Sequence, residues 1–150
     1  QLSTNSTNSV CPSGSNLINP LFGPKSKNKS SMKYTVQTTP FVVPTTDGKS
    51  IKEHFGLASN GDQNISIAHM IAPSGWSEPH QTPEFAEYTF IIRGKKQFEI
   101  EGEIIVLCAG QFIKIEPNTR IRYSNPFDEV CEYLAICLPA FSIDKVHREQ

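Results

Sequence analysis

The sequence predicts an all-β domain, either a sandwich or a barrel, and three observations lead to this expectation. Short apolar segments recur at close, regular spacing between residues 34 and 138, several with alternating side chains. Glycine, proline or asparagine stands at most of the breaks between these segments. No stretch combines a helical period with helix caps. About ten short strands at this spacing are typical of two packed sheets or a closed barrel.

The breaks between the expected strands are residues that favour turns. Asp47-Gly48 is a turn signal before one strand, and Gly94, Gly102 and Gly110 separate later strands. A turn or two of helix is expected after Pro139. The expected strands are residues 34–37, 41–43, 51–58, 64–71, 87–93, 97–100, 104–108, 111–115, 119–125 and 130–138.

The segment 64–71 has the clearest alternation in the chain. Ile65, Ile67, His69 and Ile71 fall on one side of the strand, and serine, alanine and methionine fall on the other. Because the isoleucine side is the more apolar, we expect it to face the interior. This places His69 inside the barrel.

Residues 1–31 form a second region, rich in serine, asparagine, threonine, lysine and proline. Such a segment buries too little apolar surface to order alone, so we expect an extended or disordered arm. The globular domain is expected over residues 32–150. The arm is interpreted as a remnant of a targeting extension or as an added segment that docks on a larger assembly.

Charge and hydropathy exclude several classes of protein. The net charge of −1 gives no reason to expect a nucleic-acid partner, and no apolar run is long enough to span a membrane. The sequons at Asn5, Asn28 and Asn64 lie in polar sequence where such matches arise by chance. We therefore expect an intracellular protein rather than a secreted one, with an organellar location as the alternative if a targeting segment was removed.

Three cysteines, Cys108, Cys131 and Cys137, lie in apolar strand-like segments without C-x-x-C spacing. We expect buried, reduced thiols that act as small apolar residues rather than zinc ligands. The sequence leaves their disulfide state open, because a disulfide depends on strand register.

One stretch resembles the first motif of the cupin family, commonly written G-x5-H-x-H-x3,4-E-x6-G. His80, Glu87 and Gly94 match this motif, and Glu87 and Gly94 have its spacing. Gly75 stands one place late, and Thr82 occupies the position of the second histidine.

A later stretch resembles the second cupin motif, G-x5-P-x-G-x2-H-x3-N. Gly110 and Asn125 match it in register. The proline, glycine and histidine positions hold Glu116, Asn118 and Ile121. The resemblance spans roughly residues 50–138 and implies a small single-domain cupin. Its fold would be a double-stranded β-helix, a jelly-roll barrel, and homodimers would be common.

The resemblance also implies a metal site, in which three histidines and one glutamate hold iron, manganese, nickel or zinc. This chain retains His80 and Glu87, whereas Thr82 and Ile121 replace the other two ligands. Two protein ligands rarely retain a divalent ion, so we expect a degenerate site and no cofactor. If Fe, Mn, Ni or Zn is bound after all, a displaced set would supply the ligands: His69, His80, Glu84 and Glu87.

His80 and Glu87 are the candidate catalytic residues, because a histidine and a carboxylate beside a cavity can exchange protons. The alternative is a loop histidine and a carboxylate satisfied by its neighbours. Strand alternation around these positions predicts a pocket of mixed polarity, suited to a small molecule. A packed barrel with a residual polar cluster would give the same pattern. The expected lining is His69, His80, Thr82, Glu87, Thr89, Ile121 and Tyr123.

Three functions remain open at this point. The first is a non-catalytic cupin-like binding or assembly module, whose barrel holds a small molecule and whose residues 1–31 dock on a partner. The second is a metal-dependent enzyme with a displaced His/Glu site, namely a dioxygenase, isomerase or lyase of a small polar substrate. The third is a metal-free acid/base enzyme. The ligand, the oligomeric state and whether the protein is an enzyme stay undecided.

Overall fold

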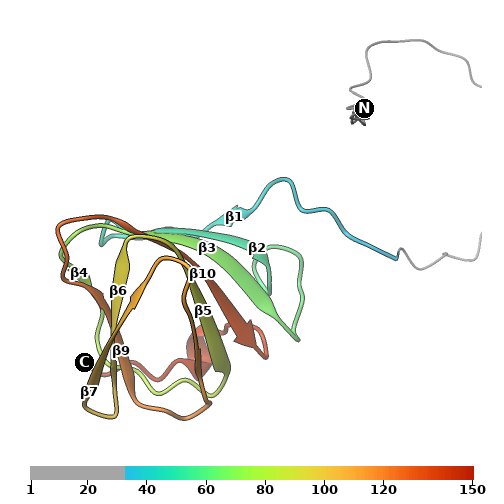
Figure 1. Ribbon diagram of the computed structural model, residues 1–150. Helices are drawn as coiled ribbons and strands as arrows, with labels where there is room; N and C mark the ends of the chain where they lie inside the picture. The colour runs from blue at the N-terminus through green and yellow to red at the C-terminus, as the bar shows by residue number, and fades with distance from the viewer. Residues whose placement is uncertain (1–32) are drawn as a thin grey trace, which may run out of the picture. The chain divides into compact units, whose positions relative to one another are not determined.

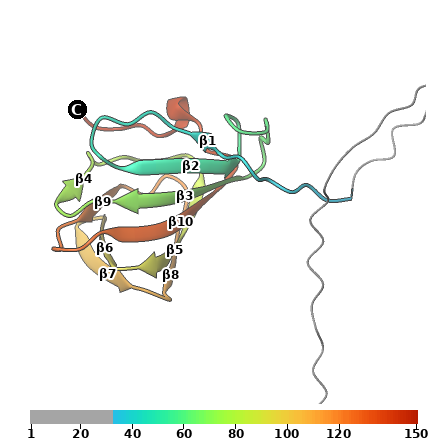
Figure 2. The same cartoon turned by 90° about the horizontal axis from the view of Figure 1, so that it is seen from above.

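The structure, a computed structural model, describes residues 33–150, and it confirms the all-β prediction. The strands form two antiparallel sheets that face each other (Figure 1). The six-stranded sheet has the order β1-β2-β3-β10-β5-β8, and the four-stranded sheet has the order β4-β9-β6-β7 (Figure 2). This is the double-stranded β-helix that the resemblance implied. The predictions for residues 1–31 lie outside the described residues.

Nine of the ten strands overlap predicted segments. The six-stranded sheet consists of β1 (Phe41–Val42), β2 (Ser50–Phe55), β3 (Ser66–Ala72), β10 (Cys131–Leu138), β5 (Ala86–Arg93) and β8 (Phe112–Ile115). The four-stranded sheet consists of β4 (Trp76–Ser77), β9 (Ile121–Asn125), β6 (Lys95–Ile100) and β7 (Glu103–Cys108). A single 3₁₀ turn, η1 (Ile143–Lys145), is the short helix expected after Pro139.

The strand prediction was wrong at two places. Residues 34–37 form no strand, and the side chains of Tyr34 and Val36 are 78% and 73% exposed. Apolar alternation alone does not order a strand that lacks a partner. The sequence reading also missed β4, because two residues are too few to show a period.

The side of β3 that faces the interior is the opposite of the predicted one. Ser66, Ala68 and Ala72 are buried between the sheets, whereas Ile67 and His69 lie half-buried on the outer face. His69 Nε2 lies 2.7 Å from Glu132 Oε1 of the neighbouring strand β10. The reason is that the inner face here borders a cavity, where small side chains leave space, so apolarity alone misidentified the interior.

Asn125 ties the end of β9 to the adjacent loops. Its side chain is fully buried, and Nδ2 donates to the carbonyl oxygens of Ala72 (3.2 Å), Pro73 (3.0 Å) and Glu129 (2.7 Å). A buried amide that satisfies three carbonyl groups holds the two sheets together at this end. This explains in physical terms why asparagine suits the last position of the second motif.

The cysteines fit their predicted role at two of three positions. Cys131 and Cys137 are buried free thiols, whereas Cys108 is exposed because it lies on β7, at the edge of the four-stranded sheet. Its predicted burial was therefore wrong. Within residues 33–150, the structure contains no helix with the length and apolarity that a membrane crossing requires.

Candidate ligand-binding site

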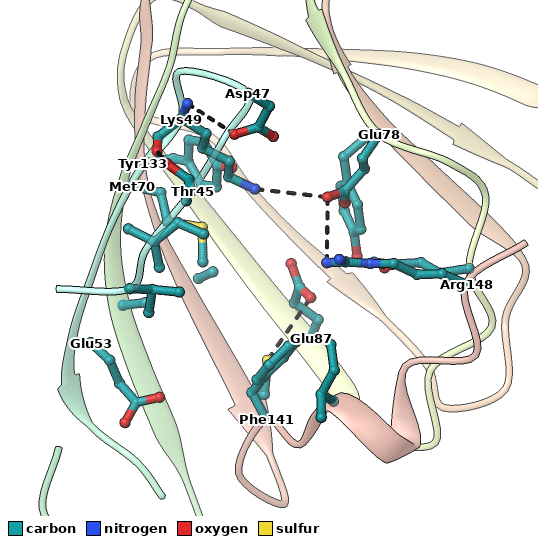
Figure 3. Close-up of a pocket in the computed structure, with 18 of the residues that line it drawn as sticks. Thr45, Asp47, Lys49, Glu53, Met70, Glu78, Glu87, Tyr133, Phe141 and Arg148 are labelled. Carbon is teal, nitrogen blue, oxygen red and sulfur yellow. Dashed lines mark hydrogen bonds and ion pairs between the residues drawn. The ribbon is translucent and has the colours of Figure 1, made fainter. Parts of the chain in front are cut away.

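A cavity of about 560 Å³ lies between the two sheets (Figure 3). Strands of both sheets contribute to its wall, together with residues 43–49 and the C-terminal segment from Phe141 to Arg148. Apolar groups such as Met70, Ala68 and Ala135 make much of the lining. The charged groups that line it are Asp47, Lys49, Glu53, Glu78, Glu87, Lys96 and Arg148.

One group of charges holds segments of the wall together. Lys49 Nζ lies 4.0 Å from Glu78 Oε2, and an Arg148 guanidinium nitrogen lies 3.8 Å from the same oxygen, as Figure 3 shows. Trp76 Nε1 donates to Asp47 Oδ2 at 2.6 Å, and this contact lowers the pKa of Asp47. These residues already have partners, so we interpret them as structural.

Glu53 is also committed to the fold. Its Oε1 accepts hydrogen bonds from the backbone N–H groups of Ala58 (3.0 Å) and Ser59 (2.9 Å). The carboxylate thereby closes the loop after β2. It borders the cavity without being free to bind a ligand there.

Lys96 is the most unusual group of the cavity. Its residue is 2% exposed, and its Nζ lies 3.4 Å from the centroid of the Tyr133 ring and 5.0 Å from that of Tyr123. The rings of Trp76 and Phe98 follow at 5.5 and 5.7 Å. Among residues 33–150 the ammonium group has no ion pair within 4.0 Å. Aromatic faces are thus its main neighbours, and they favour its cationic form.

Burial acts in the opposite direction on Lys96. Removal from water lowers the pKa of its amine to about 7, with a further contribution from the nearby charge of Lys49. The carboxylates of Glu87 and Glu78 oppose this shift. An amine with a pKa near 7 is neutral in part of the molecules at physiological pH, so it can accept as well as donate a hydrogen bond.

Glu87 reaches into the same cavity from β5. Glu87 is half-buried, and its carboxylate borders the cavity. Desolvation raises its pKa, while Lys96 and Lys49 pull it down. Its contacts are weak: Thr89 Oγ1 donates to Oε1 at 3.4 Å, and Cys137 Sγ lies 3.9 Å from Oε2. The Tyr123 hydroxyl lies close enough to lower the pKa of the carboxylate, although it is not aligned for a hydrogen bond. The carboxylate therefore retains hydrogen-bonding capacity toward the cavity.

Two tyrosine hydroxyl groups complete this inner cluster. Tyr123 and Tyr133 both line the cavity, and neither hydroxyl has a well-aligned hydrogen-bond partner among the described residues. Burial raises the pKa of both groups well above the usual value, with Glu87 adding to the effect. Both therefore stay protonated donors. We call Lys96, Glu87, Tyr123 and Tyr133 the inner cluster.

Of the seven predicted pocket residues, two line this cavity and two more are buried without lining it. Glu87 and Tyr123 line it. Thr89 is fully buried and donates to Glu87, whereas Ile121 belongs to the packed core without lining the cavity. The prediction for Ile121 as a lining residue was therefore wrong, although its side chain does point inward.

The prediction for His80 and Thr82 was wrong as well. His80 Nε2 lies 3.2 Å from Glu99 Oε1, and neither His80 nor Thr82 lines the cavity. Strand β4 ends at Ser77, so the regular alternation assumed for positions 80 and 82 does not apply. The loop instead turns Glu78 and Gln81 toward the cavity.

The displaced metal set predicted from the sequence is not assembled. His69 pairs with Glu132, His80 lies beside Glu99, and Glu84 Oε1 lies 2.6 Å from His147 Nε2. Only Glu87 of the four faces the cavity. No group of three or more histidine, cysteine or acidic side chains suited to a metal ion occurs between residues 33 and 150.

The family metal site also does not fit the residues that surround Glu87. Its near neighbours are a threonine, a thiol and two tyrosines, while the Lys96 and Lys49 ammonium groups oppose a second cation. The divalent ions that this protein family binds need several histidine or carboxylate ligands at once. The residues around Glu87 therefore do not fit the metal ions of the family.

We expect iron, manganese, nickel and zinc to be substoichiometric in protein purified without chelators. The physical reason is that one carboxylate beside an ammonium group holds a divalent ion weakly. Elemental analysis by mass spectrometry, before and after dialysis against each metal, measures this. One bound ion per chain that is lost in Glu87→Ala and kept in His80→Ala would contradict the expectation.

Sequence reasoning missed Lys96, Lys49, Gln81 and Tyr133. A signal for Lys96 was present, because strand alternation places it on the same side as the buried Phe98. A lysine on the apolar side of a strand is rare and informative. Lys49 and Gln81 lie outside the strands, so no period could have identified them.

Comparison with known proteins agrees with this fold. The Cupin domain family (Cupin_2) matches residues 68–137. The Endoribonuclease YbeY of Myxococcus xanthus (strain DK1622) is 36% identical over 108 residues, which are 72% of this chain. The chain spans only 37% of the length of that relative.

Two solved structures illustrate the similarity in space. A variant of Streptomyces PAC13 with uridine has a TM-score of 0.64 at 16% identity, over 79% of this chain and 93% of that one. An RmlC-like cupin from Shewanella frigidimarina NCIMB 400 has a TM-score of 0.60 at 14% identity, over 73% and 93%. At this identity the similarity shows the fold alone. Residues 68–137 match the cupin domain family, and the double-stranded β-helix around them is the fold of the compared cupin structure, which together support a small cupin superfamily protein.

Proposed function

We propose that this protein is a small-molecule-binding cupin that holds a polar organic ligand in its barrel without a metal ion. The observation that carries the proposal is the inner cluster. Within residues 33–150 its two hydroxyl groups lack aligned partners, Lys96 has no ion pair, and Glu87 has only weak contacts, yet all four line one cavity. Buried polar groups without partners are costly, so a ligand that satisfies them is strongly favoured.

Size and polarity support the same class of ligand. A cavity of about 560 Å³ falls within the ordinary range for small-molecule sites. The tyrosine hydroxyls and a protonated Lys96 donate hydrogen bonds, and an ionised Glu87 accepts one. A molecule with an acceptor at one position and a donor at another fits this arrangement, and apolar lining such as Met70 can contact its remainder.

The compared proteins support the proposal only at the level of the fold. The PAC13 structure contains uridine, a small polar organic molecule. The endoribonuclease activity named for the M. xanthus relative is not part of the proposal, because this chain covers a minor part of that protein.

The proposal predicts that filling the cavity abolishes ligand binding. Ala68 lines the cavity from β3, so Ala68→Phe places a ring where the ligand would lie. Thermal-shift assays on the full chain would use a fixed panel of nucleosides, amino acids, 2-oxo acids and small sugars. We expect at least one compound to raise the Tm of wild type and not that of the filled variant.

Ile67→Phe is the matched control, because Ile67 is the neighbouring residue on the outer face of the same strand. This variant should keep the wild-type shift. Ala135→Met, which fills the cavity from β10, replaces Ala68→Phe if that variant folds poorly. A panel without any shift, or equal shifts in all variants, contradicts the proposal.

Docking on a larger assembly through residues 1–31 and formation of a homodimer remain proposals from the sequence. Deleting residues 1–31 should leave the fold of residues 33–150 intact. The deletion should also abolish co-purification with a partner. Unchanged association would show that residues 1–31 do not dock on that partner.

A further inference from the structure

We propose that Lys96 binds carbonyl compounds covalently, as an imine formed between its side-chain amine and a small aldehyde or ketone in the barrel cavity. This inference rests on the proposed small-molecule site and names its chemistry. It begins from geometry: a single amine lies within an aromatic enclosure, lines a cavity of ligand size, and has no ion pair with its neighbours between residues 33 and 150.

Lys96 differs from Lys49, the other lysine of the cavity, in how free its amine is to react with a ligand. Lys49 lies 4.0 Å from Glu78 and 4.2 Å from the Trp76 ring centroid, so it has a carboxylate partner that opposes the lowering of its pKa by burial. Lys96 lacks such a carboxylate partner among residues 33–150, and desolvation together with the charge of Lys49 favours its neutral, nucleophilic form. A buried amine beside a second cation is a recognised way to make a lysine reactive at neutral pH.

Imine formation needs no reactant other than the amine and the carbonyl compound. The nitrogen lone pair attacks the carbonyl carbon and forms a C–N bond, which gives a carbinolamine. The two amine hydrogens then leave with the former carbonyl oxygen as one molecule of water, and a C=N bond remains. Glu87 lines the same cavity and can relay one of these protons.

The surroundings suit the product as well as the amine. Protonation of the imine gives a cation at the position of the former ammonium group. The Tyr133 ring at 3.4 Å and the Tyr123 ring at 5.0 Å stabilise a cation there. The hydroxyls of both tyrosines can donate hydrogen bonds to the carbinolamine oxygen, which otherwise lacks partners in an enclosed site.

Reductive trapping tests this inference. Full-length protein is mixed with glycolaldehyde and cyanoborohydride near pH 7, and the reduced adduct is located by peptide mass spectrometry. We expect Lys96 to be modified at least about ten times faster than the exposed Lys95, because Lys96 lies in the enclosed cavity and burial lowers its pKa to about 7. The rate at Lys96 should level off above about pH 7.

Several charged or titratable groups face Lys96 and shape this pH profile. Glu87 on β5 and Glu78 after β4 raise its pKa, and Lys49 before β2 lowers it. Cys131 on β10 acts in the same direction as the carboxylates, whereas Tyr123 and Tyr133 stay neutral because their pKa values are raised.

The controls separate this inference from the proposed function. Lys96→Arg keeps the positive charge and cannot form the imine, so it should lose the adduct, while Lys95→Met keeps it. Ala68→Phe should slow trapping at Lys96 and Ile67→Phe should not. Equal modification of Lys96 and Lys95 overturns the inference. If the thermal shifts persist in that case, the small-molecule site stands, whereas loss of both results removes both proposals.

Discussion

Replacing Lys96 by methionine is expected to make the protein more stable at pH 6 while abolishing trapping of glycolaldehyde at this position. The difference between the ordinary lysine pKa and about 7 corresponds to about 5 kcal/mol of unfavourable burial. Cation–π contacts of about 0.5–2 kcal/mol each return part of this energy. We therefore expect Lys96→Met to raise the free energy of unfolding by about 2–4 kcal/mol, as found when buried charges are replaced by apolar groups.

The pH dependence follows from the direction of the Lys96 shift. Between pH 7 and the ordinary lysine pKa, the unfolded chain binds a proton at Lys96 that the folded chain does not. The stability of wild type therefore rises with pH in this window, and the penalty is complete only below about pH 7. Lys96→Met lacks this component, so its advantage over wild type should shrink between pH 7 and 10.

Urea unfolding followed by the fluorescence of Trp76, the only tryptophan, measures both effects. Lys49 is buried in both wild type and variant, so the cost of its own burial cancels when the two are compared. The difference in the free energy of unfolding therefore reports chiefly on Lys96. The exposed Lys95→Met should change stability by less than about 0.5 kcal/mol. A Lys96→Met variant that is less stable than wild type at pH 6 would show that the lysine is structural.

Gly94→Ala is expected to destabilise the fold by about 3–5 kcal/mol, among the larger effects of a single substitution. Gly94 joins β5 to β6 with a φ of +78°, and a methyl group there would collide with the carbonyl oxygen of Val130. The Cα of Cys131, 3.3 Å from that methyl position, limits relief of the clash. The backbone at the start of β10 cannot move without disturbing one of the two central strands of the six-stranded sheet.

Gly102→Ala separates the clash from the backbone conformation. Gly102 lies in the β6–β7 hairpin with a φ of +89°, and no atom of residues 33–150 lies within 4 Å of its methyl position. Its substitution should cost only the left-handed conformation, about 1–2 kcal/mol. Equal losses in the two variants, measured by urea unfolding, would mean that the close approach of Val130 has no energetic effect.

The strands were predictable because each carries its own local signal. The glycines between these strands, Gly94, Gly102 and Gly110, all have positive φ, and the segments between them became β6 and β7. The local pattern did not show which face of β3 points to the interior. Both faces of β3 carry apolar residues, and only the packed structure shows that Ala68 borders a cavity while Ile67 does not.

The candidate site was predictable only where it lies on regular strands. Glu87 and Tyr123 follow strand alternation and were found, and Lys96 follows it too but was overlooked. Positions 78 to 85 form an irregular loop apart from the isolated bridge at Gln81, so the motif spacing that assigned His80 to the interior does not hold. Contacts such as those of Arg148 join the segment after β10 to the barrel and have no local signature.

A crystal structure of the full chain tests the central claim most directly. The crystals would be soaked with the panel compound that gives the largest thermal shift, and anomalous data would be collected for iron, manganese, nickel and zinc. The account predicts density for the compound between the Lys96 amine and the Glu87 carboxylate, with no anomalous peak there. A metal ion bound to Glu87, or the compound bound outside the cavity, would contradict it.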